Sequence, residues 1–346
     1  MVSLYLGILL FSFVLNSFLM VPFIDFLYKI KFQRLEQKTK DPFDKLTPIF
    51  DFFHKKKAGV PVGGGVLIVV STLIQFLFFL SLFYIFNVEV ISVFRKIKYE
   101  AVILFFTFFA FAFLGLYDDI KKIFILKSKD FFGLRLRHKL IIELCIAFIV
   151  SVWLYLWLGI DFIHIPFVGI INMGFFYILF AMFVIVAFAN AYNITDGLDG
   201  LSSGVLLINL LIFWVISSSM LDTVLSVFLA IWIGGLITFL YFNVHPARII
   251  LGDTGALAFG AAFAVIGLIL GKALLLPIIG VVFVAEIVSS LLQLLSKKYL
   301  KKKFLPVAPL HLYLQLRGWT EPKIVFRLWL TALVASLFGL WIAFLK

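Results

Sequence analysis

The feature that most constrains this chain is a series of apolar runs, each about as long as a bilayer is thick. A helix needs about 20 apolar residues to cross the hydrocarbon core of a membrane. Runs of this kind recur throughout the 346 residues, at 2–28, 60–86, 100–117, 139–158, 174–191, 201–219, 223–241, 255–270, 273–295 and 328–345. The pattern predicts an all-α integral membrane protein, with about ten transmembrane helices in a single polytopic domain, 1–346.

Composition excludes an ordinary soluble domain. Hydrophobic residues make up 64% of the chain and charged residues only 14%, whereas soluble domains contain about 25% charged residues. The first charged residue is Asp25, so the first run lacks the basic start of a cleavable signal peptide and is expected to remain as a span. Cys145 is the single cysteine, which rules out an intramolecular disulfide.

The basic residues predict how the chain is oriented. Of the 30 Lys and Arg residues, 25 fall in alternate loops, at 29–58, 118–139, 192–200, 242–253 and 297–327. Short loops rich in Lys and Arg stay in the cytoplasm, so both termini should face outward and these loops inward. Topology and attraction to anionic lipid heads account for most of the lysines. Nucleic acid is not an expected partner, because the basic residues are divided among separate loops.

Acidic residues are more informative, because an idle carboxylate at a membrane boundary is costly. Five of the 18 acids, Asp118, Asp119, Asp196, Asp199 and Asp253, follow or precede spans on the predicted cytoplasmic face. Brought together they would repel each other unless lysines or a cation such as Mg²⁺ neutralised them. Such a cluster is typical of phosphate chemistry, in which hard cations bridge phosphate oxygens.

Each acidic site also has a structural interpretation. Asp118 and Asp119 could form a solvated helix end paired with Lys122, and Asp196 and Asp199 could be turn residues. Asp253 or its neighbour Thr254 could cap the eighth span, which is compatible with metal binding.

A glycine-rich stretch opens the second span. Gly59, Gly63, Gly64 and Gly65 follow three lysines, 55–57. Backbone N–H groups at a helix start can cradle a phosphate, although the spacing differs from that of a P-loop. The alternative is close helix packing through small residues.

Taken in order, the motifs resemble those of the polyprenyl-phosphate N-acetylhexosamine-1-phosphate transferase superfamily, and within it the branch of phospho-N-acetylmuramoyl-pentapeptide transferases. The resemblance covers nearly the whole chain. It is carried by KAGVPVGGG (57–65), YDDIKK (117–122), GLRLRHKL (133–140), NAYNITDGLDGL (190–201), FNVHPARIILGDTGAL (242–257), Glu286 within VVFVAEIVSSLLQ (281–293), and APLHLYLQLRGWTEPKIVFRLW (308–329).

The resemblance implies a bacterial enzyme of peptidoglycan synthesis, multi-pass in the cytoplasmic (inner) membrane, with its active site on the cytoplasmic face. It implies a Mg²⁺-dependent reaction in which undecaprenyl phosphate attacks a UDP-amino sugar, releasing UMP and leaving lipid I. The expected partners are undecaprenyl phosphate, the UDP-sugar and membrane lipids. The oligomeric state stays open, with a homodimer among the options.

The resemblance also assigns roles to residues of this chain. Asp253 is the expected Mg²⁺ ligand, and Asp118, with Asp119 beside it, is expected to position or deprotonate the lipid phosphate. The expected substrate-binding residues are Asn190, Asn193, Asp196, Asp199, Lys57, Lys122, Lys139 and His311.

The chain departs from the family pattern in two places. Val60 and Val62 replace threonines around Pro61, and the last cytoplasmic loop reads His311-Leu312-Tyr313 where the muramoyl branch has three histidines. Gln315 replaces the acid that commonly follows, and its neutral amide could help orient His311. These changes leave UDP-N-acetylglucosamine open as an alternative donor. A transporter or flippase is less favoured, because its ionisable groups would lie near the bilayer midplane.

Overall fold

The apolar runs form long helices. The computed structural model describes residues 2–33, 57–94, 97–124, 136–165 and 168–345. In this part of the chain, nine helices are long and apolar enough to cross a membrane. They are α1 (Val2–Lys29), α3 (Gly64–Ile85), α4 (Ile97–Phe124), α5 (Leu136–Leu158), α6 (Phe176–Thr195), α7 (Leu201–Ser219), α8 (Thr223–Asn243), α9 (Gly252–Ile269) and α13 (Glu321–Ala343). The prediction of an all-α multi-pass membrane protein is confirmed.

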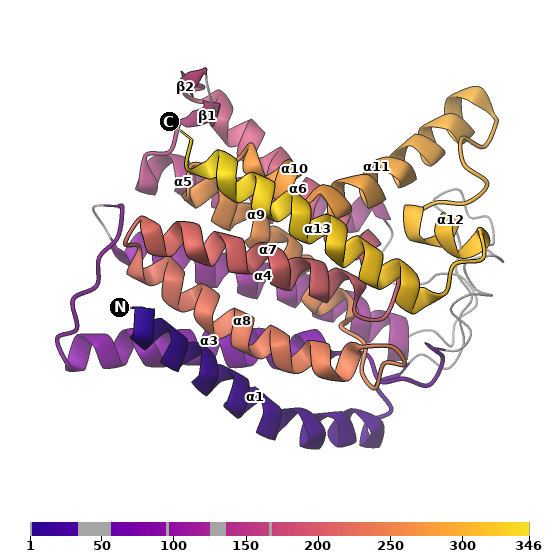
Figure 1. Cartoon of the computed structure of the whole chain (residues 1–346), viewed down its shortest axis with the longest axis horizontal. Helices are drawn as coiled ribbons and strands as arrows, with labels where there is room; N and C mark the ends of the chain where they lie inside the picture. Colours follow the sequence, from indigo (N-terminus) through magenta and orange to yellow (C-terminus); the bar gives the residue numbers. More distant parts are fainter. Residues whose placement is uncertain (1, 34–56, 95–96, 125–135, 166–167, 346) are drawn as a thin grey trace.

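The predicted span at 273–295 is not one helix. It is divided into α10 (Leu275–Ile279) and α11 (Val281–Leu295), and α11 leans away from the other helices (Figure 1). Pro277 lacks a backbone N–H and Gly280 has low helix propensity, so both weaken a continuous helix here. A π-helical turn, η2 (Ser296–Leu300), extends α11.

Two small elements were not predicted from the apolar runs. Strands β1 (Phe162–Ile165) and β2 (Gly169–Asn172) form an antiparallel hairpin between α5 and α6. The short helix α12 (Leu310–Leu316) precedes α13. The hairpin lies at one end of the bundle and α12 at the other (Figure 1).

Helix α9 is the centre of the fold. Every one of its residues is buried, and α3, α4 and α6 pack against it. Glycines allow the closest approaches: a Cβ on Gly115 of α4 would lie 2.2 Å from the carbonyl oxygen of Asp253, and a Cβ on Gly65 of α3 would lie 2.3 Å from the backbone nitrogen of Gly255. Helix packing in membranes relies on such small residues.

The glycine-rich stretch at the start of α3 serves this packing. The backbone N–H groups of Gly63 and Gly64 both donate to the carbonyl oxygen of Ile250, at 3.0 Å, and that of Gly65 donates to Leu251 at 2.9 Å. These donors are therefore engaged by the chain itself. The contacts of Gly63, Gly64 and Gly65 therefore support close helix packing, and they do not support a phosphate-binding role for these N–H groups.

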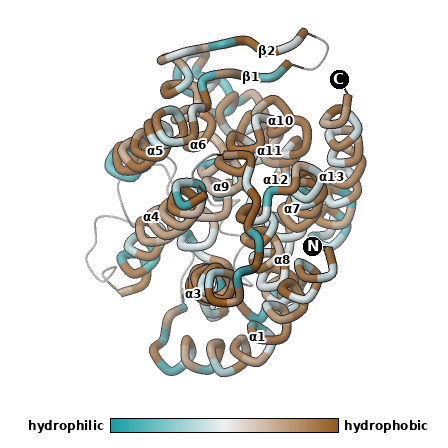
Figure 2. Tube along the Cα trace, turned by 90° about the vertical axis from the view of Figure 1, so that its left-hand side faces the viewer, coloured by the Kyte–Doolittle hydropathy of each residue, from teal (hydrophilic) through white to brown (hydrophobic). Residues whose placement is uncertain are grey.

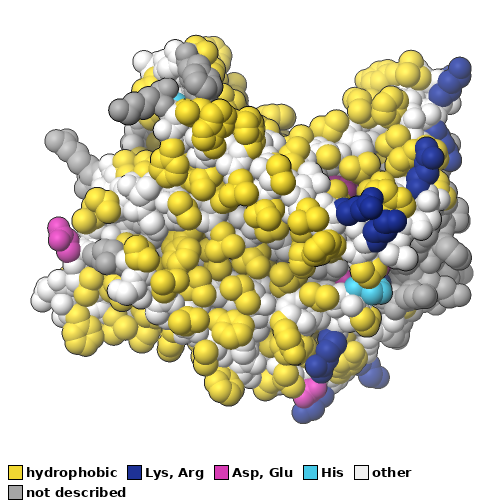
Figure 3. Space-filling view, viewed as in Figure 1, with side chains coloured by type: hydrophobic (Ala, Val, Ile, Leu, Met, Phe, Trp, Pro, Cys, Tyr) yellow, Lys and Arg dark blue, Asp and Glu magenta, His cyan; other side chains and the backbone are white. Residues whose placement is uncertain are grey.

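The outer surface is apolar along the helices and polar at one end. Apolar residues continue along the outer helices (Figure 2), and Lys and Arg side chains gather at one end of the molecule (Figure 3). Helix α1 begins and α13 ends at the opposite end (Figure 1). The two ends of the described chain therefore lie at the same end of the bundle, while the membrane side of each end stays a prediction.

Candidate active site

Two aspartates and two lysines form the centre of the polar end. Asp118 lies near the end of α4 and Asp253 in the first turn of α9. The Nζ of Lys122 lies 2.9 Å from Asp118 Oδ2 and 2.7 Å from Asp253 Oδ2. The Nζ of Lys139, from α5, lies 3.2 Å and 2.6 Å from the same two oxygens. Each lysine thus bridges both carboxylates, and the four formal charges balance. We call Asp118, Asp253, Lys122 and Lys139 the central cluster.

Asp119 has a different environment from its neighbour Asp118. Its carboxylate accepts hydrogen bonds from the backbone N–H of Asp253 at 3.1 Å, and from the backbone N–H and hydroxyl of Thr254, both at 2.9 Å. Asp119 therefore caps α9 from α4, where the helix dipole favours a negative charge. The sequence suggested that Asp253 or Thr254 could cap this helix, but the capping carboxylate comes from Asp119 on α4. The predicted catalytic role of Asp119 stays a prediction.

A second ion-pair cluster surrounds Lys57. Its Nζ lies 2.8 Å from Asp199 Oδ1 and 2.9 Å from Glu321 Oε1, and it donates to the carbonyl oxygen of Gly197 at 2.9 Å. Glu321, in the first turn of α13, also accepts from the backbone N–H of Asp199 at 2.6 Å. The cluster joins the segment before α3, the α6–α7 turn and the start of α13, which are far apart in the sequence.

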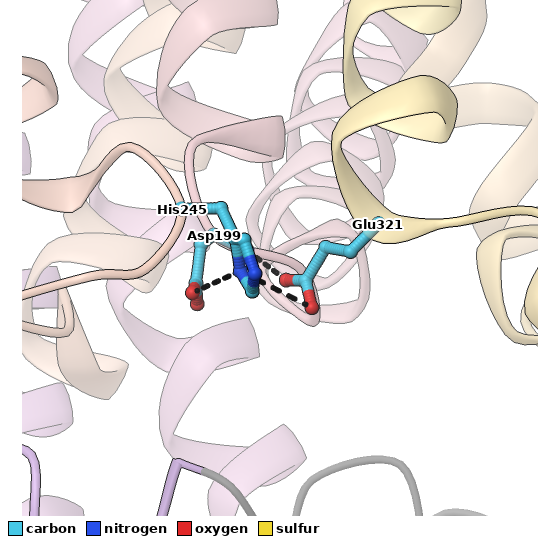
Figure 4. Close-up of side chains that lie close together, drawn as sticks. All are labelled: Asp199, His245 and Glu321. Atoms are coloured by element: carbon cyan, nitrogen blue, oxygen red, sulfur yellow. Dashed lines mark hydrogen bonds and ion pairs between the residues drawn. The ribbon is translucent and has the colours of Figure 1, made fainter.

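His245 completes this cluster (Figure 4). Its Nδ1 lies 3.1 Å from Asp199 Oδ2 and 3.7 Å from Glu321 Oε2. Asp199, His245 and Glu321 are close enough to share a cation. Lys57 already supplies one positive charge that both carboxylates share, so the arrangement is an ion-pair cluster whose carboxylates are partly neutralised by the chain itself.

The two aspartates of the α6–α7 turn have opposite electrostatic environments. Burial raises the pKa of Asp196 to about 6, although the Ser202 hydroxyl and Lys57 oppose this shift. Burial also disfavours ionised Asp199, but Lys57, the Ala247 amide and His245 together hold the pKa of that carboxyl below its usual value. Asp196 is also within electrostatic range of Asp253, which places this turn beside the central cluster.

Both predicted asparagines lie on helix α6, which continues beyond the predicted end of this span at residue 191 to Thr195. The Nδ2 of Asn190 donates to Glu143 Oε2 at 2.6 Å and to the carbonyl oxygen of Val186 at 3.0 Å. Asn193 follows three residues later, on the same side of the helix, and is half-buried. Because Glu143 is one turn after Lys139 on α5, it connects the asparagine side of the site to the central cluster.

His311 is buried and held by Glu286. Its backbone N–H donates to both Glu286 oxygens, at 3.1 and 3.3 Å, and its Nδ1 lies 3.0 Å from Oε2. An ionised carboxylate only accepts hydrogen bonds, so Nδ1 is the donor. Within the described residues no hydrogen bond joins Gln315 to His311, and Glu286 orients the histidine instead.

The other nitrogen of His311 points toward the α6–α7 turn. A Cβ on Gly197 would lie 2.4 Å from Nε2, and within the described residues Nε2 has no hydrogen-bond partner. Gly197 is thus contacted by His311 on one side and by Lys57 through its carbonyl group. The last polar loop and the glycine-rich segment meet at this residue.

The structure therefore gathers the predicted site residues at one end of the bundle, in connected groups. It adds four residues for which sequence reasoning gave no role: Glu143, His245, Glu286 and Glu321. Glu143 and Glu286 were recognisable in principle, as acids within otherwise apolar runs, and Glu286 is also among the motif residues of the family resemblance. The partners of His245 and Glu321 come from distant segments and leave no local signal.

The opposite pKa shifts generate a prediction. Asp196→Asn should stabilise the protein at pH 8, because it removes an ionised group that burial disfavours. This gain should shrink as the pH falls through about 6, toward the usual value of 3.8. Asp199→Asn should destabilise the protein, because its lowered pKa means that the ionised form stabilises the fold. That loss should persist from pH 8 to about pH 4.5, and the gain for Asp196→Asn should be no more than about 3 kcal/mol.

Apparent unfolding temperatures of the two variants in detergent, measured across this pH range, check the prediction. The unmodified protein is the reference at every pH. Parallel pH profiles for the two variants would contradict it.

Comparison with known proteins agrees with this geometry. The model of the family described as glycosyl transferase family 4 matches residues 101–271. The phospho-N-acetylmuramoyl-pentapeptide-transferase of Caldanaerobacter subterraneus subsp. tengcongensis is 36% identical over 313 residues, covering 90% of each chain. That of Staphylococcus aureus strain RF122 is 35% identical over 293 residues, covering 84% of this chain and 87% of the relative. That of Clostridium perfringens strain 13 is 35% identical over 316 residues, covering 91% and 90%. The chain belongs to the family of phospho-N-acetylmuramoyl-pentapeptide transferases.

Proposed function

We propose that this protein transfers phospho-N-acetylmuramoyl-pentapeptide from a UDP-linked donor to undecaprenyl phosphate, forming lipid I for peptidoglycan synthesis and releasing UMP. The observation that carries the proposal is the central cluster, in which Lys122 and Lys139 each bridge Asp118 and Asp253. Family membership supplies the substrates, and the cluster supplies the charges that a transfer between phosphates needs.

In the proposed reaction, an oxygen of the lipid phosphate forms a bond to the phosphorus that carries the sugar. The bond from that phosphorus to the oxygen of UMP breaks, and UMP leaves with the electron pair. The protein's task is positioning and charge neutralisation, as in other phosphoryl transfers. Lys122 and Lys139 neutralise phosphate oxygens, and Asp118 orients the lipid phosphate. An ionised lipid phosphate needs little help from a base, so direct attack is favoured over a covalent enzyme intermediate.

The same cluster fits a magnesium ion. Mg²⁺ prefers carboxylate and phosphate oxygens, and Asp253, supported by Asp118, would hold it. When bound, it would neutralise the diphosphate and the leaving UMP. The lysines that now bridge the two aspartates would then be available to substrate phosphates. Asp119 would act by keeping the first turn of α9, and with it Asp253, in place.

The nucleotide-sugar side of the site would be formed by α6 and the turn that follows it. Asn190, Asn193, Asp196 and Asp199 lie along this path, and Lys57 is attached to its far end through Asp199. Glu143 and Glu286 lie farther inside their helical segments than the aspartates of the site. They contact Asn190 and His311, as structural partners would, rather than lining a transport path. This arrangement supports an enzyme over a transporter.

The proposed function is tested by offering two donors side by side. UDP-N-acetylmuramoyl-pentapeptide and UDP-N-acetylglucosamine are each incubated with undecaprenyl phosphate and Mg²⁺, and UMP release is measured. We expect release with the first donor, at least about tenfold faster than with the second, since lost polar contacts cost specificity. Faster turnover of UDP-N-acetylglucosamine would assign the protein to another glycan pathway, and no release from either would reject the transferase.

Asp253→Asn tests the metal site. The amide keeps the shape of the side chain but removes the charge, so turnover should fall by about a hundredfold or more. The measurement is the initial rate of UMP release across a Mg²⁺ titration. Asp222→Asn is the matched control, because Asp222 is a buried acid that caps α8 at the other end of the bundle and Asn is also a good N-cap. Near-normal turnover of Asp253→Asn would leave Asp253 with a structural role only.

His311 should be more important than the residues that replace the family's other histidines. His311→Ala should lower the rate of UMP release about tenfold to a hundredfold, the effect of losing one charge-assisted hydrogen bond. Leu312→Ala and Tyr313→Ala should each retain most of the activity, because Leu312 is buried in packing and the Tyr313 hydroxyl accepts hydrogen bonds from Arg317. The three variants are compared at equal amounts of folded protein. Equal rates for His311→Ala and the unmodified enzyme would contradict the prediction.

A further inference from the structure

A basic and aromatic segment follows α11 at residues 296–305. It consists of the π-helical turn η2 and the residues after it, and we call it the lysine loop. Its exposed cations are Lys298, Lys301, Lys302 and Lys303. Three large apolar side chains are exposed among them: Tyr299 at 69%, Leu300 at 69% and Phe304 at 61%. No acidic residue occurs in the sequence between Glu286 and Glu321. Within the described part of the chain, these four lysines form no ion pair with a carboxylate, unlike the lysines of the central cluster.

The lysine loop is folded back on α11 rather than extended. The Nε2 of Gln293 donates to the carbonyl oxygen of Leu305, and the backbone N–H of Leu305 donates to Gln293 Oε1, both at 2.9 Å. The hydroxyl of Ser296 donates to the carbonyl oxygen of Lys302 at 2.7 Å. These bonds use no lysine ammonium group. The four exposed lysines thus project from a hydrogen-bonded backbone. Replacing one of their ammonium groups leaves the hydrogen bonds of Gln293 and Ser296 in place.

The position of the lysine loop follows from α11. This helix exposes Val288, Leu291, Leu292 and Leu295, and it leans away from the bundle (Figures 1 and 3). In a membrane protein an exposed apolar helix face contacts acyl chains. The loop begins directly after Leu295, where the apolar face ends, so it lies at the level of the lipid head groups. Aromatic residues and lysines are favoured at that depth.

We propose that the lysine loop binds the head groups of anionic phospholipids and anchors α11 at the membrane surface. The four exposed ammonium groups complement phosphate charges, while Tyr299, Leu300 and Phe304 enter the interface beside them. Each lysine near an anionic surface strengthens binding about fivefold. The Lys298 ammonium lies 5.2 Å from the centre of the Tyr299 ring, so a charged and an aromatic contact group lie side by side. The proposal concerns bulk lipid and depends only on the membrane character of the chain.

The test uses a fluorophore placed in the loop. Cys145 is the only cysteine, so a Cys145→Ser background with Leu300→Cys allows a single site to be labelled. The labelled full-length protein is reconstituted in phosphatidylcholine vesicles with equal small fractions of spin-labelled phosphatidylglycerol or spin-labelled phosphatidylcholine. We expect phosphatidylglycerol to quench the fluorophore at least about threefold more, and high salt to reduce the difference.

Two charge-matched variants complete the design. Lys302→Gln with Lys303→Gln should bring the quenching ratio of the two lipids close to one. Lys29→Gln with Lys31→Gln removes as many exposed charges at the end of α1, on the other side of the same polar end (Figure 1), and should leave the ratio unchanged. Equal quenching by the two lipids with the lysines intact would overturn the proposal. So would an unchanged ratio in the loop variant, or an equal fall in both variants.

Discussion

The capping of α9 by Asp119 is the interaction on which the polar end depends. Helix α9 is buried along its whole length, so its first N–H groups need an acceptor from within the protein. Asp119 supplies it from α4, while Gly115, one turn earlier on α4, lets the two backbones approach. Asp118, the neighbour of Asp119, then lies beside Asp253, and the lysines of α4 and α5 reach both. Helix packing and the chemistry of the site therefore have the same geometric cause.

Charge balance explains how so many acids coexist at one end of an apolar bundle. The central cluster pairs two carboxylates with two ammonium groups, and Lys57 lies between Asp199 and Glu321. Ion pairs of this kind offset the cost of removing charges from water only when their geometry is good. They are also exchangeable, because a phosphate can replace a carboxylate as the partner of a lysine. In the proposed reaction, a central cluster that is balanced before its substrates bind would exchange its aspartates for the phosphates of the donor and acceptor, and the proposed Mg²⁺ would then pair with the aspartates.

Much of the fold was predictable, because a bilayer requires runs of about 20 apolar residues whatever the rest of the sequence does. The break near Gly280 was missed, since apolar character continues through it and only Pro277 and the glycine mark it. The site was predictable as a set of residues but not as a set of contacts. Glu321 and Lys57 are 264 residues apart, and Glu286 and His311 are 25 apart. Neither pairing follows from spacing within a helix, so the sequence suggested only Gln315, four residues from His311, as a side chain that could help orient it.

The Glu286–His311 contact also explains how the last loop can work with a single histidine. His311 is positioned through both its backbone and its ring, so its Nε2 has one direction in which to point, and that direction is toward Gly197. Glu321 fixes the other end of the same turn through the backbone of Asp199 and through Lys57. The turn that carries Asp196 and Asp199 is therefore bonded to α13, and on its other side it faces His311 of α12, which Glu286 of α11 positions. Leu312 is buried in packing and the Tyr313 hydroxyl accepts hydrogen bonds from Arg317, so neither neighbour of His311 takes part in these contacts with the turn.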